Sequence, residues 1–235
     1  MSKHIGIVGV SPEGASLCYR QVSRHASLRL PPEQHPTISV HNMPLAHYVA
    51  AIRDDDWRGV GQMLRDSAQK LASIGAHFCF SPDNAVQHAV QLADAGSPIP
   101  WLKMTDAVAE ALIRDGRRTV GVIGTRFVTT GSAYQTDLGM KGIKLVRPSE
   151  DDADRLDRII FSELVYGTIR DESRAIVQAV IDAYRERQCE GIILGCSEAP
   201  LVISPSASSL PVYNASDLIA ERAIDYAIGA EPASA

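Results

Sequence analysis

The chain has 235 residues, of which 45% are hydrophobic and 22% charged, and this is an ordinary balance for a folded protein with one large core or two small ones. Its net charge of -5, together with the lack of any block of lysine and arginine, argues against a nucleic-acid surface, which needs basic residues clustered on one face. We therefore expect a small-molecule partner and no nucleic acid.

The first apolar run, residues 4–10, is interrupted by Gly6 and Gly9 and is too short for a signal segment or a membrane span. We therefore expect a cytoplasmic protein without a membrane partner. The four cysteines lack the close C-x-x-C spacing of a zinc or redox site, so we expect no metal and cysteines that act singly. Three of them lie within or beside apolar patterns and are predicted to be core residues: Cys18, Cys79 and Cys189.

Short apolar runs, typical of buried parallel strands, alternate along the chain with longer amphipathic stretches, typical of helices. Strands are expected over 4–10, 37–41, 77–81, 119–124, 144–146 and 191–195. Helices are expected between them, for example over 60–74, 152–166 and 173–187. Right-handed crossovers would join such strands into parallel sheets flanked by helices, so the predicted class is α/β.

The second half of the chain repeats the first at a displacement of roughly 111 to 115 residues, which indicates an internal duplication. Residues 6–10 resemble 121–125, residues 77–83 match 190–196, and residues 100–110 match 211–221. The last pair is predicted to be a strand followed by a helix in both copies. We expect two pseudo-symmetric lobes, one formed by 1–102 with 211–235 and the other by 103–210.

The repeat aligns Asp83 with Cys196, each directly after a predicted strand. Ligands of such folds bind at the carboxyl ends of the strands, so a pseudo-two-fold axis would place both residues on opposite walls of a cleft between the lobes. Neutral hydrogen-bond donors at equivalent strand ends are expected to bind the substrate: Ser11, Asn84, Thr125 and Ser197.

Each member of the pair also has a second interpretation. Asp83 precedes a helical stretch, so it also fits an N-cap whose side chain accepts from the first turn of that helix. Cys196 precedes a predicted helix as well, where free N–H groups would favour a thiolate and bind a substrate carboxylate. Its alternative is an ordinary buried cysteine.

Several motifs together resemble the aspartate/glutamate racemase family over essentially the whole chain. Residues 6–10 resemble its first Gly-Ile-Ile-Gly-Gly strand, and residues 82–85 stand in place of its Pro-Cys-Asn-Thr segment. Residues 195–198 resemble its Gly-Cys-Thr-Glu segment and residues 123–126 its Leu/Ile-Gly-Thr-Arg motif. The stretch 160–174 is also similar to the family's.

The resemblance implies a dimeric racemase of amino-acid metabolism that uses no pyridoxal phosphate or other cofactor and in which two cysteines flank the α-carbon of the substrate. The chain departs from this pattern at the first cysteine, which is Asp83. It also has Ala85 for the family's Thr and Gln87 for its His. Apolar Val49 and Val165 stand at what we judge to be the positions of basic residues in aspartate-specific members, so the resemblance does not identify the substrate.

With reference pKa values of about 3.9 for Asp and about 8.5 for Cys, the pair at neutral pH is a carboxylate and a thiol. We predict a cofactor-independent racemase or epimerase that acts at the carbon α to a carboxylate, with Asp83 as base and Cys196 as acid. One alternative is a lyase or isomerase of the arylmalonate-decarboxylase or maleate-isomerase type that uses Cys196. The other is a non-catalytic protein that binds small acids.

Overall fold

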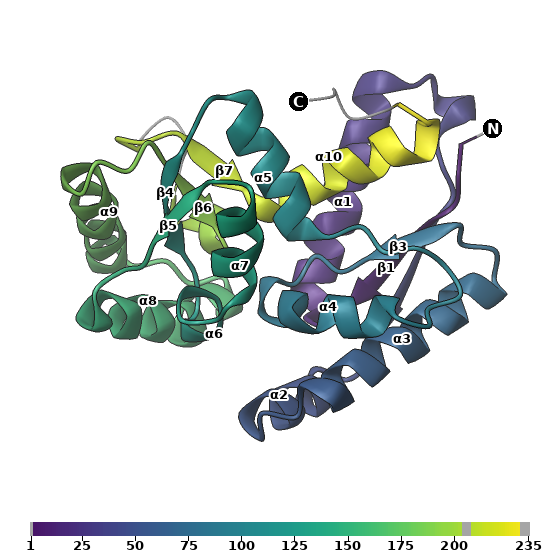
Figure 1. Cartoon of the computed structure of the whole chain (residues 1–235), viewed down its shortest axis with the longest axis horizontal. Helices are drawn as coiled ribbons and strands as arrows, with labels where there is room; N and C mark the ends of the chain where they lie inside the picture. Colours follow the sequence, from purple (N-terminus) through teal and green to yellow (C-terminus); the bar gives the residue numbers. More distant parts are fainter. Residues whose placement is uncertain (1, 204–207, 231–235) are drawn as a thin grey trace. The chain divides into compact units, whose positions relative to one another are not determined.

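The computed structural model describes residues 2–203 and 208–230. The chain forms two compact units, Met1–Met104 with Ser216–Ala235 and Thr105–Ala215. Each unit contains its own parallel sheet with helices packed against it (Figure 1). In the part of the chain that the structure describes, no helix is both long and apolar enough to cross a membrane.

The sheet of the first unit has the order β2-β1-β3, with all strands parallel. The strands are β1 (Ile5–Gly9), β2 (Ile38–Asn42) and β3 (Phe78–Phe80). A single bridge between Cys79 and Trp101 extends this sheet beyond β3. The helical elements that lie in this unit or begin or end it are α1 (Pro12–Arg29), η1 (Pro32–Gln34), α2 (Leu45–Arg53), α3 (Trp57–Ser73), η2 (Asn84–Val86), α4 (Gln87–Asp94) and α10 (Ala215–Ile228).

β1 and β3 are buried on both faces of the sheet, toward which successive side chains point alternately, whereas the edge strand β2 is partly exposed. Val8 and Cys79 belong to a buried cluster with Leu64 of α3. Phe78 points the other way and packs edge-on against the ring of Tyr226 in α10. Burial on both faces explains why β1 and β3 are continuous apolar runs rather than alternating ones.

The sheet of the second unit has the order β5-β4-β6-β7, again fully parallel. The strands are β4 (Thr119–Ile123), β5 (Lys144–Val146), β6 (Gly191–Leu194) and β7 (Val212–Asn214). The helical elements are α5 (Met104–Arg114), α6 (Arg126–Thr129), α7 (Ala133–Met140), α8 (Glu150–Ser162), η3 (Leu164–Tyr166), α9 (Asp171–Glu186) and η4 (Ala199–Leu201). Side chains of α8 and α9 form one buried cluster with β4 and β6.

The two sheets repeat each other in strand register as well as in strand order. Ile5 of β1 pairs with Phe78 of β3, as Val120 of β4 pairs with Gly191 of β6. Equivalent rows of paired residues run across the two sheets, Gly6–Cys79–Trp101 in the first and Gly121–Ile192–Val212 in the second. The displacements between these rows are those of the sequence repeat, so the structure supports the alignment that places Asp83 opposite Cys196.

The chain crosses between the units a few residues from the expected positions. β7 pairs with β6, so residues 212–214 belong to the sheet of the second unit, whereas the sequence assigned everything from residue 211 to the first lobe. Met104 remains with the first unit, and the second begins at Thr105. Sheet pairing decides these boundaries, and the sequence pattern does not reveal which strands pair.

Candidate functional site

The two aligned residues occupy the same place in their respective sheets. β3 lies next to β1, and the chain leaves it through Ser81 and Pro82 to Asp83. β6 lies next to β4, and the chain leaves it through Gly195 to Cys196. Each residue therefore stands at the carboxyl end of a strand beside the first strand of its own unit, where folds of this class bind ligands.

The carboxylate of Asp83 binds the start of the first long helix. Its Oδ2 atom accepts hydrogen bonds from the backbone N–H groups of Val10, at 3.2 Å, and Ser11, at 3.1 Å. Ser11 is the N-cap of α1, and its Oγ accepts from the N–H of Gly14 at 3.2 Å. Asp83 thus places a negative charge at a helix N-terminus, where the helix dipole favours anions.

The alternative interpretation of Asp83, as the N-cap of the helix that follows it, was wrong. Asp83 precedes η2, but its side chain makes no capping hydrogen bond there. The geometry is instead set by Gln87, whose side-chain nitrogen donates to the carbonyls of Ser81, at 3.1 Å, and Asp83, at 3.0 Å. The Gln87 Oε1 accepts from the N–H of Met104 at 3.2 Å. Gln87, which replaces the family's His, therefore anchors the loop that presents Asp83.

Cys196 is buried, with 8% of its surface exposed. Its Sγ donates to Oε2 of Glu198 at 2.9 Å, and Ser197 Oγ donates to the same oxygen at 2.9 Å. Burial, followed by the negative charge of Glu198 and the hydrogen bond to it, raises the pKa of Cys196 well above its ordinary value. The N–H groups of Glu198 and Ala199 act in the opposite direction and do not outweigh these effects.

The prediction that an α-helix starts after Cys196, where free N–H groups would favour a thiolate, was wrong. β6 is followed by a turn and the three-residue η4 (Ala199–Leu201) rather than by an α-helix. So short an element has little dipole, and the adjacent Glu198 carboxylate opposes a second negative charge. The direction of the pKa shift of Cys196 agrees with the prediction that this residue is a thiol at rest.

The remaining expected substrate-binding residues differ in how their side chains are engaged. Asn84 is the first residue of η2 and is 8% exposed. Thr125 precedes α6, and its Oγ1 is buried without a hydrogen-bond partner among the residues that the structure describes. Ser11 and Asp83 lie together in the first unit, and Ser197 and Cys196 lie together in the second.

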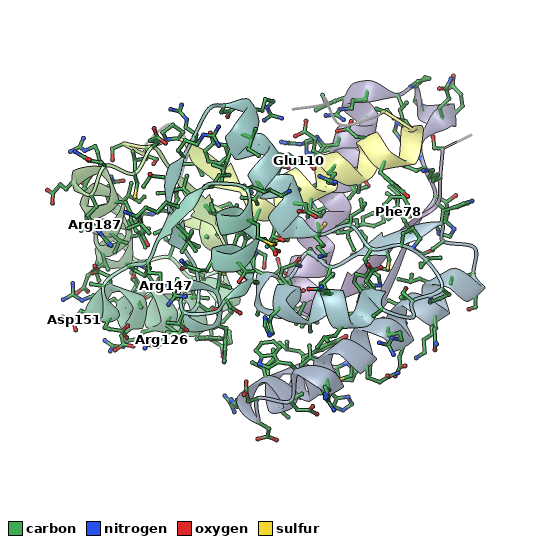
Figure 2. All side chains as sticks on the ribbon, in the orientation of Figure 1. Phe78, Glu110, Arg126, Arg147, Asp151 and Arg187 are labelled. Carbon is green, nitrogen blue, oxygen red and sulfur yellow. The ribbon has the colours of Figure 1, made fainter. Side chains whose placement is uncertain are left out.

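The counterpart of the Asp83 contact in the second unit involves a different carboxylate. The backbone N–H of Arg126, at the start of α6, donates to Oδ1 of Asp157 at 2.8 Å. The Arg126 guanidinium lies beside α8 (Figure 2), where it pairs with Asp154 at 2.6 Å and Glu150 at 2.7 Å. The carboxylates that bind Arg126, shortly after the end of β4, therefore all come from helix α8. α6 begins directly after Thr125.

The other three cysteines lie in the cores of the units, as the sequence predicted. Cys18 and Cys79 have no exposed surface, and Cys189 is 5% exposed. Burial raises the pKa of each of these thiols. No group of three or more His, Cys, Asp or Glu side chains suited to a metal ion occurs within residues 2–203 and 208–230.

A groove of about 760 Å³ lies along α1 and the end of β2 in the first unit. Its lining is mainly apolar and includes Pro12, Tyr19, Val40 and Met43. It contains neither Asp83 nor any other residue that the sequence predicts to bind substrate.

Two carboxylates that make several contacts, those of Glu198 and Glu163, were not predicted from the sequence to have a role. Glu198 lies two residues after Cys196 within a recognised motif, so its position was a usable signal. Glu163 is 5% exposed and accepts from Ser173 Oγ at 2.9 and 2.8 Å and from the N–H of Arg170 at 3.4 Å. Glu163 therefore links the end of α8 to the start of α9. The turn between these helices brings Glu163 close to Arg170 and Ser173.

Comparison with known proteins identifies the family of this chain and agrees with its fold. The family model described as Asp/Glu/Hydantoin racemase matches residues 7–223, so the chain belongs to this family. A candidate Asp/Glu racemase from Yersinia pestis is similar in structure, with a TM-score of 0.90 and 28% identity over 96% of this chain and 99% of that one. An aspartate racemase homologue from Pyrococcus horikoshii OT3 has a TM-score of 0.86 and 27% identity over the same shares.

A more distant similarity concerns the fold alone. Glutamate racemase from Francisella tularensis, solved in complex with D-glutamate, has a TM-score of 0.69 and 14% identity, over 100% of this chain and 85% of that one. The family and the structural neighbours support an enzyme of the racemase type.

Proposed function

We propose that this protein is a cofactor-independent racemase or epimerase that exchanges the proton on the carbon α to a carboxylate, with Asp83 as base and Cys196 as acid. The observation that carries the proposal is the equivalence of the two residues. Each follows the same strand of a duplicated sheet, in matching register, and one is a carboxylate while the other is a thiol.

The chemistry of the pair suits this reaction. An α-proton beside a carboxylate is weakly acidic, so its removal needs a positioned base and stabilisation of the charge that develops on the substrate. Asp83 takes the proton from one face of the α-carbon, and Cys196 delivers its thiol proton to the other. The product then has inverted configuration, while Asp83 is protonated and Cys196 is a thiolate. Return of both groups to their resting states completes the cycle.

The proposed substrate-binding groups are those with donors at the strand ends. Thr125 has the strongest support because its buried hydroxyl oxygen has no hydrogen-bond partner in the described residues. Asn84 follows Asp83 directly and offers an amide. Ser197 already donates to Glu198, and the Ser11 oxygen already accepts from Gly14, so these two serines would have to share their contacts with a substrate.

A second candidate function is a lyase in which Cys196 alone protonates a carbanion left by loss of carbon dioxide. The contacts of Asp83 favour this candidate. A carboxylate oxygen that already accepts two backbone N–H bonds at a helix N-terminus is stabilised as an anion and is a weaker base. In this reaction Asp83 would stabilise the start of α1 rather than transfer protons.

Deuterium incorporation in heavy water distinguishes the candidates. Wild-type protein is incubated with a panel of amino acids, hydroxy acids and substituted malonates and followed by NMR, beside Asp83→Asn, Cys196→Ala and the control Cys189→Ala. The racemase proposal predicts α-deuteration and both enantiomers of one substrate, lost in the first two variants and kept in the control. Carbon dioxide release that survives Asp83→Asn but not Cys196→Ala would show the lyase instead.

An additional variant, Asp83→Cys, restores the thiol of the family's pattern. A two-base mechanism predicts that this variant keeps exchange that Asp83→Asn loses. A lyase that relies on Cys196 alone predicts that both variants behave alike. Saturable binding of an acid by the wild type without deuteration or carbon dioxide release would indicate a binding protein and contradict both catalytic candidates.

A further inference from the structure

A single carboxylate oxygen organises the surroundings of Cys196. Oε2 of Glu198 accepts from both the thiol of Cys196 and the hydroxyl of Ser197, each at 2.9 Å. The Glu198 side chain is itself buried, with 6% of its surface exposed. A buried carboxylate in direct contact with a thiol is a strongly coupled pair, because water screens its charge poorly.

The charge of Glu198 acts directly on the proton of Cys196. Besides burial, the groups that shift the pKa of Cys196 are the Glu198 carboxylate, which raises it, and the N–H groups of Glu198 and Ala199, which lower it. The neighbouring α9 contributes Arg174, whose guanidinium donates to the carbonyl of Val202 at 3.3 Å. Among the described residues, Glu198 is thus the charged group that sets the state of this thiol.

We propose that Glu198 is a positioning residue that sets the proton affinity of Cys196, so that the thiol is retained as an acid at rest and the thiolate becomes a strong base once formed. This inference rests on the proposed function for its catalytic meaning. The electrostatic coupling between the Glu198 carboxylate and the Cys196 thiol does not depend on a substrate.

The proton balance shows what the carboxylate adds. When Cys196 protonates the substrate, its S–H bond breaks, a C–H bond forms at the α-carbon, and the S–H electron pair remains on sulfur. Two anions, the thiolate and the Glu198 carboxylate, then lie in contact. Their repulsion favours recapture of a proton by sulfur, so the thiolate is a stronger base for the weakly acidic α-proton in the reverse direction.

The test is the pH dependence of Cys196 alkylation by iodoacetamide, measured for each cysteine by mass spectrometry on wild type and Glu198→Gln. Glutamine keeps the shape and one oxygen acceptor but removes the charge. The midpoint for Cys196 is expected to fall by about one pH unit or more, which makes alkylation about tenfold faster near neutral pH. Glu190→Gln, with the same charge change before β6, should leave the midpoint unchanged.

Two further readouts separate this coupling from a structural role. Glu198→Asp retains the charge, so its Cys196 midpoint should stay nearer to the wild type than that of Glu198→Gln. The buried Cys189 in the same sample reports any general opening of the second unit, since its alkylation should not change. An unmoved Cys196 midpoint in Glu198→Gln, or equal shifts in the Gln and Asp variants, would overturn the proposal.

The exchange measurement tests the proposed reaction, whereas the alkylation measurement tests the coupling between Glu198 and Cys196. If wild type shows no α-proton exchange on any substrate but the Cys196 midpoint moves, the proposed reaction is wrong and the coupling to Glu198 holds. If exchange is found and Glu198→Gln slows it without moving the midpoint, Glu198 acts through structure alone and the inference is refuted. Both a moved midpoint and slower exchange are expected.

Discussion

Replacement of Asp83 by Asn tests the contact at the start of α1 through the stability of the first unit. In the wild type, Oδ2 accepts from two backbone N–H groups, those of Val10 and Ser11. Asparagine has nearly the same shape and keeps one oxygen acceptor, but it removes the negative charge. The substitution therefore changes the strength of these hydrogen bonds and leaves the packing nearly unaltered.

The magnitude follows from the difference between charged and neutral acceptors. A hydrogen bond to a charged group contributes about 1.5–3 kcal/mol, against about 0.5–1.5 kcal/mol for a neutral one, so two bonds lose about 2 kcal/mol. The two distances, 3.2 and 3.1 Å, are at the long end of the usual range, which lowers this value. We expect Asp83→Asn to reduce the free energy of unfolding by about 1–2 kcal/mol, including the charge–dipole effect at the helix start.

Urea unfolding followed by tryptophan fluorescence is the appropriate assay, because both tryptophans of the chain, Trp57 and Trp101, lie in the first unit. Asp157→Asn is the matched control, since its carboxylate accepts from the N–H of Arg126 at a helix start in the second unit. The control should leave the fluorescence transition largely in place. A loss below about 0.5 kcal/mol for Asp83→Asn, as for an ordinary surface substitution, would refute the reasoning.

Two further predictions concern the buried cores. Gly121→Ala should lower the free energy of unfolding, measured by calorimetry, by about 1–3 kcal/mol. The new Cβ would lie 2.6 Å from the ring of Tyr184, and this ring is held in place because its hydroxyl donates to the carbonyl of Val122. Unchanged stability would show that the ring can move at no cost. Burial raises the thiol pKa of Cys18 and Cys79, so both thiols stay protonated in the folded state at a pH where the unfolded thiols ionise. The free energy of unfolding should therefore keep its full value below about pH 8.5. Above this pH it should decline by up to about 1.4 kcal/mol per pH unit for each thiol. Urea midpoints between pH 7 and 10 measure this decline, and Cys18→Ala should reduce its slope.

Much of the fold was predictable because its signals are local. The strands around Ile7 and Ile192 are continuous apolar runs, which burial on both faces of a parallel sheet requires. The internal repeat predicted two similar lobes, and the orders β2-β1-β3 and β5-β4-β6 are equivalent, because equivalent segments of a duplicated chain form equivalent pairs. The resemblance in motifs to the racemase family agrees with the family match over residues 7–223.

The chemical state of the candidate site was less predictable because it depends on which groups meet. The sequence predicted a helix start after Cys196 with N–H groups that favour a thiolate, whereas the structure has a short turn there and a carboxylate in contact with the sulfur. Asp83 appeared to cap the helix that follows it, whereas its acceptor oxygen binds N–H groups 72 and 73 residues earlier in the chain. A one-dimensional pattern gives no information on contacts of that separation.

The sequence by itself determined the α/β class, the duplication and the alignment of Asp83 with Cys196, because apolar periodicity and repeated motifs are properties of neighbouring residues. Only the tertiary structure decided that Asp83 binds the start of α1 and that burial, together with Glu198, raises the pKa of Cys196. Hydrogen bonds and pKa shifts depend on distances of about 3 Å and on burial, and these arise only when the sheets and helices of each unit pack together.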